Sequence, residues 1–141
     1  MKTTVTTLAT VCIMMTSISS FATEKINPLK DYNSVNIVAT YLHAVTTGNI
    51  TFNKFLFADD FEYRNTANNV CYNKKAYSNF LKKNEDLKFN CETTYEILDE
   101  CGKACVAKVT MKFPTFTRLD YITLNHGLDG WKVSKVVTTY P

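Results

Sequence analysis

The sequence is poor in glycine, proline and histidine, with four, three and two residues respectively in a chain of 141. So few chain-breaking residues exclude collagen-like, low-complexity and linker segments. The two histidines, His43 and His126, are far apart and predict neither a catalytic triad nor a metal centre. The net charge of +3 is small and its lysines are scattered, which excludes a nucleic-acid partner. No metal and no cofactor is predicted.

The first 22 residues have the pattern of a secretory signal peptide. Met1-Lys2 supplies the cation, an apolar stretch follows from about residue 5 to 18, and Ser20-Phe21-Ala22 is a small-x-small cleavage site. The alternative is a frayed N-terminal helix. A membrane helix is not expected, because this stretch is too short to span a bilayer and no apolar run after residue 22 is long enough to do so. The protein is therefore expected to be exported, periplasmic or secreted, as a domain of 141 − 22 = 119 residues.

The cysteines are consistent with an exported, oxidising compartment. Of five cysteines, one leaves with the signal peptide, and Cys71, Cys91, Cys101 and Cys105 remain. An even number in an exported chain favours disulfides. We expect a Cys101–Cys105 disulfide, because the two residues flank a hairpin loop; C-x3-C without a nearby histidine is poor spacing for zinc. Whether Cys71 and Cys91 pair is left open.

Hydrophobic periodicity predicts three helices after a lead-in arm at residues 23–30. Apolar residues recur at helical spacing over 33–47, with Asn33 as the cap and Gly48 ending the last turn. A short helix is expected from Thr51 to about Asp60. A third helix begins after Asn73 and has an apolar face of Ala76, Tyr77, Phe80 and Leu81.

The rest of the sequence alternates as strands do. Strands are expected at 61–65, 88–99, 106–113, 117–125 and 131–140. A hairpin around 102–104 would pair Ile97 with Val109 and Tyr95 with Met111, so that both apolar faces coincide. The expected class is α+β.

The order helix, short helix, strand, helix and strand meander, bent at Pro114, resembles the nuclear transport factor 2-like superfamily. Two short motifs add to the resemblance, Phe57-Ala58-Asp59-Asp60-Phe61 before the first strand and Gly130-Trp131-Lys132-Val133 at the last. It covers residues 31–141 and is nearest to exported bacterial SnoaL-like and lumazine-binding-like members. It implies a cystatin-like cone, with three N-terminal helices packed on a curved antiparallel sheet of about five strands. Such cones often hold a pocket, and members are often homodimers through the outer face of the sheet.

The resemblance also implies where chemistry would occur, since enzymes of this fold usually place a carboxylate or histidine with a tyrosine inside the cone. The candidate carboxylate is Asp120, with Tyr41 or Tyr63. Alternation places Asp120 on the same strand face as Ile122, although the neighbouring face is apolar too. The alternative is a surface aspartate paired with Arg118 or a lysine.

Six large side chains are candidates for lining a pocket: Tyr41, Phe61, Tyr63, Tyr95, Met111 and Trp131. The alternative for such residues is core packing. The favoured function is an exported domain that binds a small apolar or aromatic molecule without catalysing a reaction. A lyase or isomerase with an Asp/Tyr pair, and a dimeric protein-interaction module, are the alternatives.

Overall fold

A computed structural model describes residues 25–141; the predicted signal peptide, residues 1–22, lies outside the described residues. Three helices and six strands follow in the order α1 (Ser34–Thr46), α2 (Asn53–Leu56), β1 (Phe57–Asn65), β2 (Val70–Asn73), α3 (Lys74–Lys83), β3 (Glu92–Cys101), β4 (Ala104–Lys112), β5 (Thr117–Gly127) and β6 (Gly130–Thr139). Within residues 25–141, no helix combines the length and apolar character needed to cross a bilayer.

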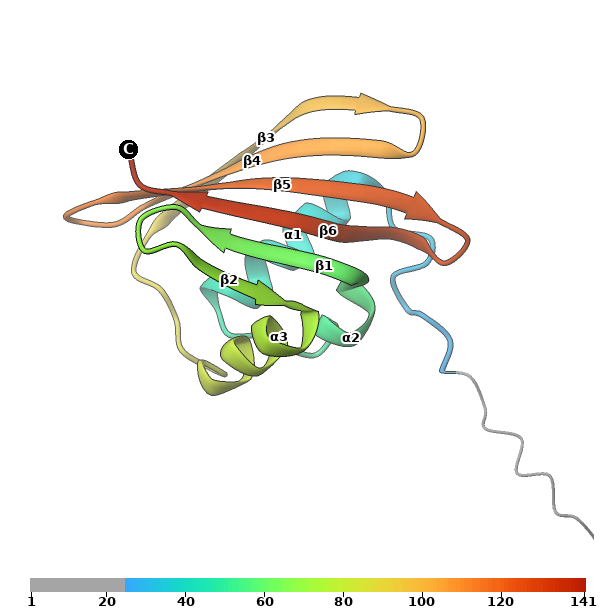
Figure 1. Ribbon diagram of the computed structural model, residues 1–141, viewed down its shortest axis with the longest axis horizontal. Helices are drawn as coiled ribbons and strands as arrows, with labels where there is room; N and C mark the ends of the chain where they lie inside the picture. Colours follow the sequence, from blue (N-terminus) through green and yellow to red (C-terminus); the bar gives the residue numbers. More distant parts are fainter. Residues whose placement is uncertain (1–24) are drawn as a thin grey trace, which may run out of the picture.

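The strands form one curved sheet in the order β2-β1-β6-β5-β4-β3, with the helices on one face (Figure 1). The α+β class is confirmed, but the sheet has six strands rather than about five and is mixed. β1 pairs with β6 in parallel, whereas every other pair is antiparallel. The prediction missed β2, whose four residues are too few to show alternation. α3 lies between β2 and β3, so the helices are not all N-terminal.

α1 confirms its predicted bounds. The Asn33 side chain accepts a hydrogen bond from the Asn36 N–H at 2.8 Å, as an N-cap does. Gly48 follows the helix with φ of +66°, and a Cβ there would lie 2.4 Å from the Asp86 nitrogen. Gly48 therefore both ends the helix and allows the chain after α3 to pass close by. The buried side of α1 packs against β4 and β6.

The predicted second helix is too long. Only Asn53–Leu56 is helical, and Phe57 already belongs to β1, where it pairs with Val133 of β6. Phe57, Phe61 and Tyr63 are the buried residues of β1. Sheet pairing and burial thus override the local helical pattern of this segment.

The β3–β4 hairpin forms, with its register two residues from the predicted one. Tyr95 pairs with Val109, and an irregularity follows Ile97 before Cys101 pairs with Ala104 and Glu100 with Cys105. Cys105 shares a face of the sheet with its partner Glu100, and Cys101, the next residue of β3, points to the opposite face. Cys101 is accordingly exposed and Cys105 is buried. The predicted Cys101–Cys105 disulfide is wrong for this structure, in which both thiols are free, as are those of Cys71 and Cys91.

The described part of the lead-in arm is packed against the domain. Leu29 is fully buried, and the Asn27 amide donates to the Asp129 carbonyl at 2.9 Å. Gly130 has φ of +92°, and a Cβ there would lie 2.5 Å from the Lys30 carbonyl oxygen. The arm and the β5–β6 turn therefore fit together only because residue 130 has no side chain.

Candidate functional site

Asp120 points into the space between the sheet and the helices. It lies on β5, its Cα partners are Val109 on β4 and Thr138 on β6, and its exposed fraction is zero. The alternative of a surface aspartate is therefore wrong. The predicted ion pair between Asp120 and Arg118 is confirmed, but the Arg118 side chain is buried as well.

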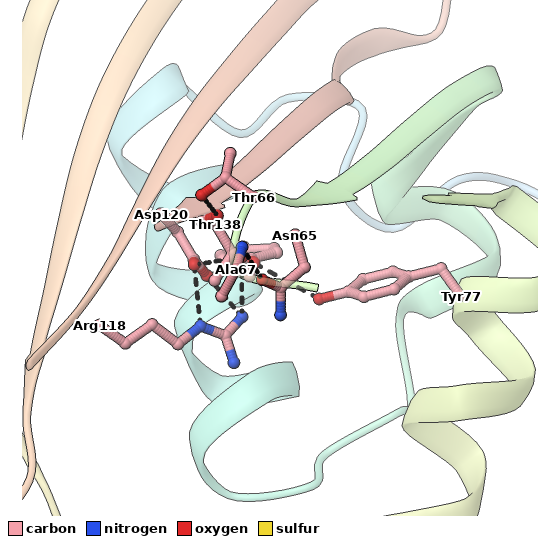
Figure 2. A network of polar contacts seen from close by, with 8 residues as sticks. Asn65, Thr66, Ala67, Tyr77, Arg118, Asp120 and Thr138 are labelled. Carbon is pink, nitrogen blue, oxygen red and sulfur yellow. Dashed lines mark hydrogen bonds and ion pairs between the residues drawn. The ribbon is translucent and has the colours of Figure 1, made fainter. Parts of the chain in front are cut away.

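Asp120 accepts four hydrogen bonds (Figure 2). Arg118 donates from Nε to Oδ1 and from Nη2 to Oδ2, both at 2.9 Å. Thr138 Oγ1 donates to Oδ1 at 2.7 Å, and the Tyr41 hydroxyl donates to Oδ2 at 2.6 Å. A carboxylate has about four lone-pair positions, so its acceptor capacity is used up by the protein itself.

This interior network, comprising Tyr41, Tyr77, Arg118, Asp120 and Thr138, joins four elements. Tyr41 comes from α1 and Tyr77 from α3, and their hydroxyl oxygens are 3.4 Å apart. The Thr138 carbonyl accepts from the Thr66 N–H at 3.0 Å, which ties the β1–β2 turn to β6. The network therefore fixes both long helices and a turn relative to the centre of the sheet.

Burial sets the protonation states of the network. Burial, followed by the nearby Asp120 charge, raises the pKa of Tyr41 well above its usual value, and burial likewise raises the pKa of Tyr77. Burial alone would lower the pKa of the Arg118 guanidinium, but Asp120 more than offsets this and the pKa is raised. At neutral pH both tyrosines are donors and Arg118 is a cation.

One end of the Arg118 guanidinium is not used by the network. Nη1 makes none of these hydrogen bonds, and in Figure 2 it points away from Asp120 and Thr138. In residues 25–141, Asn53 Oδ1 is the only fully buried side-chain nitrogen or oxygen found without a hydrogen-bond partner, so Nη1 is not among the buried unpaired groups. The side chain as a whole is 11% exposed. Arg118 is thus a fixed cation with a donor group to spare.

Most of the predicted pocket-lining residues are core residues. Tyr41, Phe61, Tyr63 and Met111 are buried, and Tyr63 stacks on Tyr77 with ring centroids 4.6 Å apart. These four fill the interior, as the core-packing alternative expected.

The other two candidates differ from each other, since Trp131 also belongs to the buried core and Tyr95 does not. Trp131 is buried near the β5–β6 turn, where its ring meets His126 edge-on at 5.1 Å. Tyr95 is 45% exposed on β3, so its prediction as a residue lining an interior pocket is wrong. β3 is an edge strand, and its inner face is mostly uncovered.

An aromatic cluster, of which only Phe113 was a candidate for lining a pocket from the sequence, lies at the end of the sheet where β5 begins. We call it the aromatic rim: Phe89, Phe113, Phe116 and Tyr140. Phe113 and Phe116 stack at 4.4 Å, Phe89 lies 5.6 Å from Phe113, and Tyr140 lies 5.9 Å from Phe116. Figure 1 shows the β4–β5 connection and the C-terminus at this same end of the molecule. Phe113 and Phe116, on either side of Pro114-Thr115 and just before Arg118, were the available signal.

Comparisons with known proteins identify the fold. No family model and no curated protein sequence matches the chain. Among solved structures, a protein of unknown function from Silicibacter pomeroyi, described as NTF-2-like, is 14% identical with a TM-score of 0.63, over 76% of this chain and 92% of that one. This chain has the nuclear transport factor 2-like fold.

Two further NTF2-like proteins agree with this result. One from Cytophaga hutchinsonii is 13% identical with a TM-score of 0.62, over 76% of this chain and 94% of that one. One from Rhodospirillum rubrum, described as of unknown function in nutrient uptake, is 14% identical with a TM-score of 0.61, over 77% and 98%. At such identities the NTF2-like fold is shared, and function must be argued from the site.

Proposed function

We propose that this chain is an exported domain that binds a small apolar or aromatic molecule and performs no covalent chemistry on it. The observation that carries the proposal is the state of Asp120, which is fully buried and accepts four hydrogen bonds from the protein. A general base needs a lone pair within reach of the substrate proton. Asp120 has none free, so its role is to hold Arg118.

A binding role would use the groups that the interior network does not occupy, which are Arg118 Nη1 and the aromatic rim. Ligand sites are mostly apolar and contain a few fixed polar groups that orient the ligand. Arg118 is such a group, because two hydrogen bonds to Asp120 fix its plane while Nη1 stays free. The aromatic rim offers apolar surface at the same end of the sheet, with Phe116 47% and Tyr140 41% exposed.

Export is proposed from the pattern of residues 1–22, with cleavage after Ala22. The described domain begins to pack at Asn27, so such a cleavage would leave the folded part whole. The intact mass of the protein recovered from the periplasm or medium of expressing cells tests this. A product beginning at Thr23 is expected; a product that stays in the cytoplasm with residues 1–22 attached would contradict export.

Binding is tested by thermal unfolding in the presence of aromatic and apolar metabolites, charged and neutral. A ligand at 100 times its Kd stabilises the folded state by about 2.7 kcal/mol. For a domain of this size that corresponds to a Tm increase of roughly 10 °C. Failure of every compound to raise Tm would contradict the proposal. Recovery of a chemically changed compound from the complex would contradict its non-catalytic part.

A further inference from the structure

The free donors near Arg118 include a second group, the side-chain amide of Asn65. Asn65 is the Cα partner of Thr138, whose hydroxyl oxygen lies 3.4 Å from Arg118 Nη2. Its Oδ1 accepts from the Ala67 N–H at 2.9 Å, which fixes the amide so that Nδ2 is the free end. In Figure 2 this nitrogen is turned to the same side as Nη1 of Arg118.

Two donors turned to one side, one of them cationic, select an acceptor with negative charge. Guanidinium groups bind carboxylates through short, charge-assisted hydrogen bonds. Asp120 bonds only to Nε and Nη2 of the guanidinium, whose positive charge is delocalised over all three nitrogens. The positive end of Arg118 therefore remains attractive to a second anion at Nη1.

Aromatic residues lie close to Arg118 along the chain. Phe116 is two residues before Arg118 in the chain, and its ring stacks on Phe113. Burial raises the pKa of the Cys91 thiol and the Arg118 charge opposes this rise, and Cys91 lines a surface hollow together with Phe113 of the aromatic rim. A molecule packed on the rim would thus have the Cys91 thiol close by.

We infer that the ligand is an aromatic or apolar carboxylic acid, whose carboxylate is bound by Arg118 Nη1 and Asn65 Nδ2 and whose ring packs on the aromatic rim. This inference rests on the proposed binding function and adds the class of ligand. Arg118 and Asn65 are the specificity-determining residues, and Asp120 is a positioning residue.

The test is isothermal titration of the mature protein with 2-naphthoate, phenylacetate and benzoate, each compared with its own primary amide. The acids are expected to bind at least about tenfold more tightly than the amides, since a hydrogen bond to a charged group is worth about one such factor. Equal affinity of acids and amides would overturn the inference while leaving the proposed function standing. Absence of binding by the acids, with binding of other compounds in the thermal screen, would do the same.

Two substitutions locate the site without dismantling the fold. Arg118→Lys keeps a cation beside Asp120 but has no second nitrogen to offer. Asn65→Asp keeps the oxygen that accepts from Ala67 and replaces the free donor with negative charge. Each should weaken 2-naphthoate binding about tenfold or more, whereas Arg64→Lys, at an exposed position of β1, should not change it. Unchanged affinity in the first two variants would overturn the inference.

Cys91 supplies a separate readout. Bound 2-naphthoate should slow the alkylation of Cys91 by iodoacetamide several-fold, as followed by mass spectrometry. Cys101, exposed near the distant β3–β4 turn, is the internal control and should react at an unchanged rate. Equal effects on both thiols, or none on Cys91, would place the ligand elsewhere and contradict the assignment.

Discussion

β3 and β4 are paired strands with the same alternating pattern, but their inner faces have different environments. Tyr95 on β3 is 45% exposed, whereas its Cα partner on β4, Val109, is fully buried. α1 packs against β4 and β6. It contacts β3 through Ser34, the first residue of α1, whose hydroxyl donates a hydrogen bond to the Glu100 carboxylate at 2.7 Å. Alternation therefore determines the side to which a residue points, and the covering helix determines whether that side is buried.

The largest effect is expected inside the covered region. Arg118→Leu should destabilise the fold by about 3–5 kcal/mol, because it leaves the buried Asp120 charge without its cation. The double variant Arg118→Met with Asp120→Leu should recover much of that loss, since no charge is left unpaired. Urea unfolding measures both. Equal losses in the single and double variants would show that the charge of the pair is not what matters.

The comparison of the two strands can be tested directly with two truncations. Met111→Ala on β4 removes a fully buried side chain and should cost about 2–5 kcal/mol. Tyr95→Ala on β3 removes a larger but half-exposed side chain and should cost about 1 kcal/mol or less. The free energies of unfolding come from the same urea titrations. A greater loss for Tyr95→Ala would mean that β3 is covered in solution.

The two network tyrosines should differ although both are buried. Tyr41→Phe removes a hydrogen bond to a carboxylate and should cost about 1.5–3 kcal/mol. Tyr77→Phe removes only the long contact with the Tyr41 hydroxyl and should cost about 0.5 kcal/mol or less. Similar losses of unfolding free energy in both variants would contradict the assignment of Tyr41, and not Tyr77, as the direct hydrogen-bond donor to Asp120.

The same tyrosines predict how stability depends on pH. The pKa values of Tyr41 and Tyr77 are raised in the folded state above their usual value of 10.0, so above about pH 10 the unfolded chain releases protons that the folded protein retains. Their contribution to stability is complete below pH 10 and falls above it, by up to about 1.4 kcal/mol per pH unit for each group. Urea unfolding at pH 8, 10 and 11 should show a steeper loss in the wild type than in Tyr77→Phe. Parallel curves would contradict the assigned shift.

Local signals predicted the elements that depend on neighbouring residues. Some signals depend only on residues that are close together in the sequence: the cap at Asn33, the periodicity of α1 and the two-residue alternation of β4, β5 and β6. The structure confirms all of them. Their order sufficed to identify the NTF2-like fold.

Features that depend on distant pairing were not predictable in this way. The parallel pairing of β1 with β6, and the irregularity after Ile97 that turns Cys101 and Cys105 to opposite faces, arise from contacts between segments. Asp120 was a candidate, but apolar Leu119 and Tyr121 on the other face of β5 left its direction open. The packing of α1 on this side of the sheet, seen in the Tyr41–Asp120 hydrogen bond, makes the face of Asp120 the buried one.

The most direct test of the central claim, that Asp120 holds Arg118 ready for a ligand, is the ¹H–¹⁵N NMR spectrum of the arginine side chains. Arg64 and Arg118 are the only arginines of the chain, and Arg64 is exposed. The Nε–H signal of Arg118 should exchange slowly with water, because Nε donates to Asp120, and it should move when 2-naphthoate is added while that of Arg64 stays in place. A rapidly exchanging Arg118 signal, or one that does not respond when the compound binds, would contradict the account.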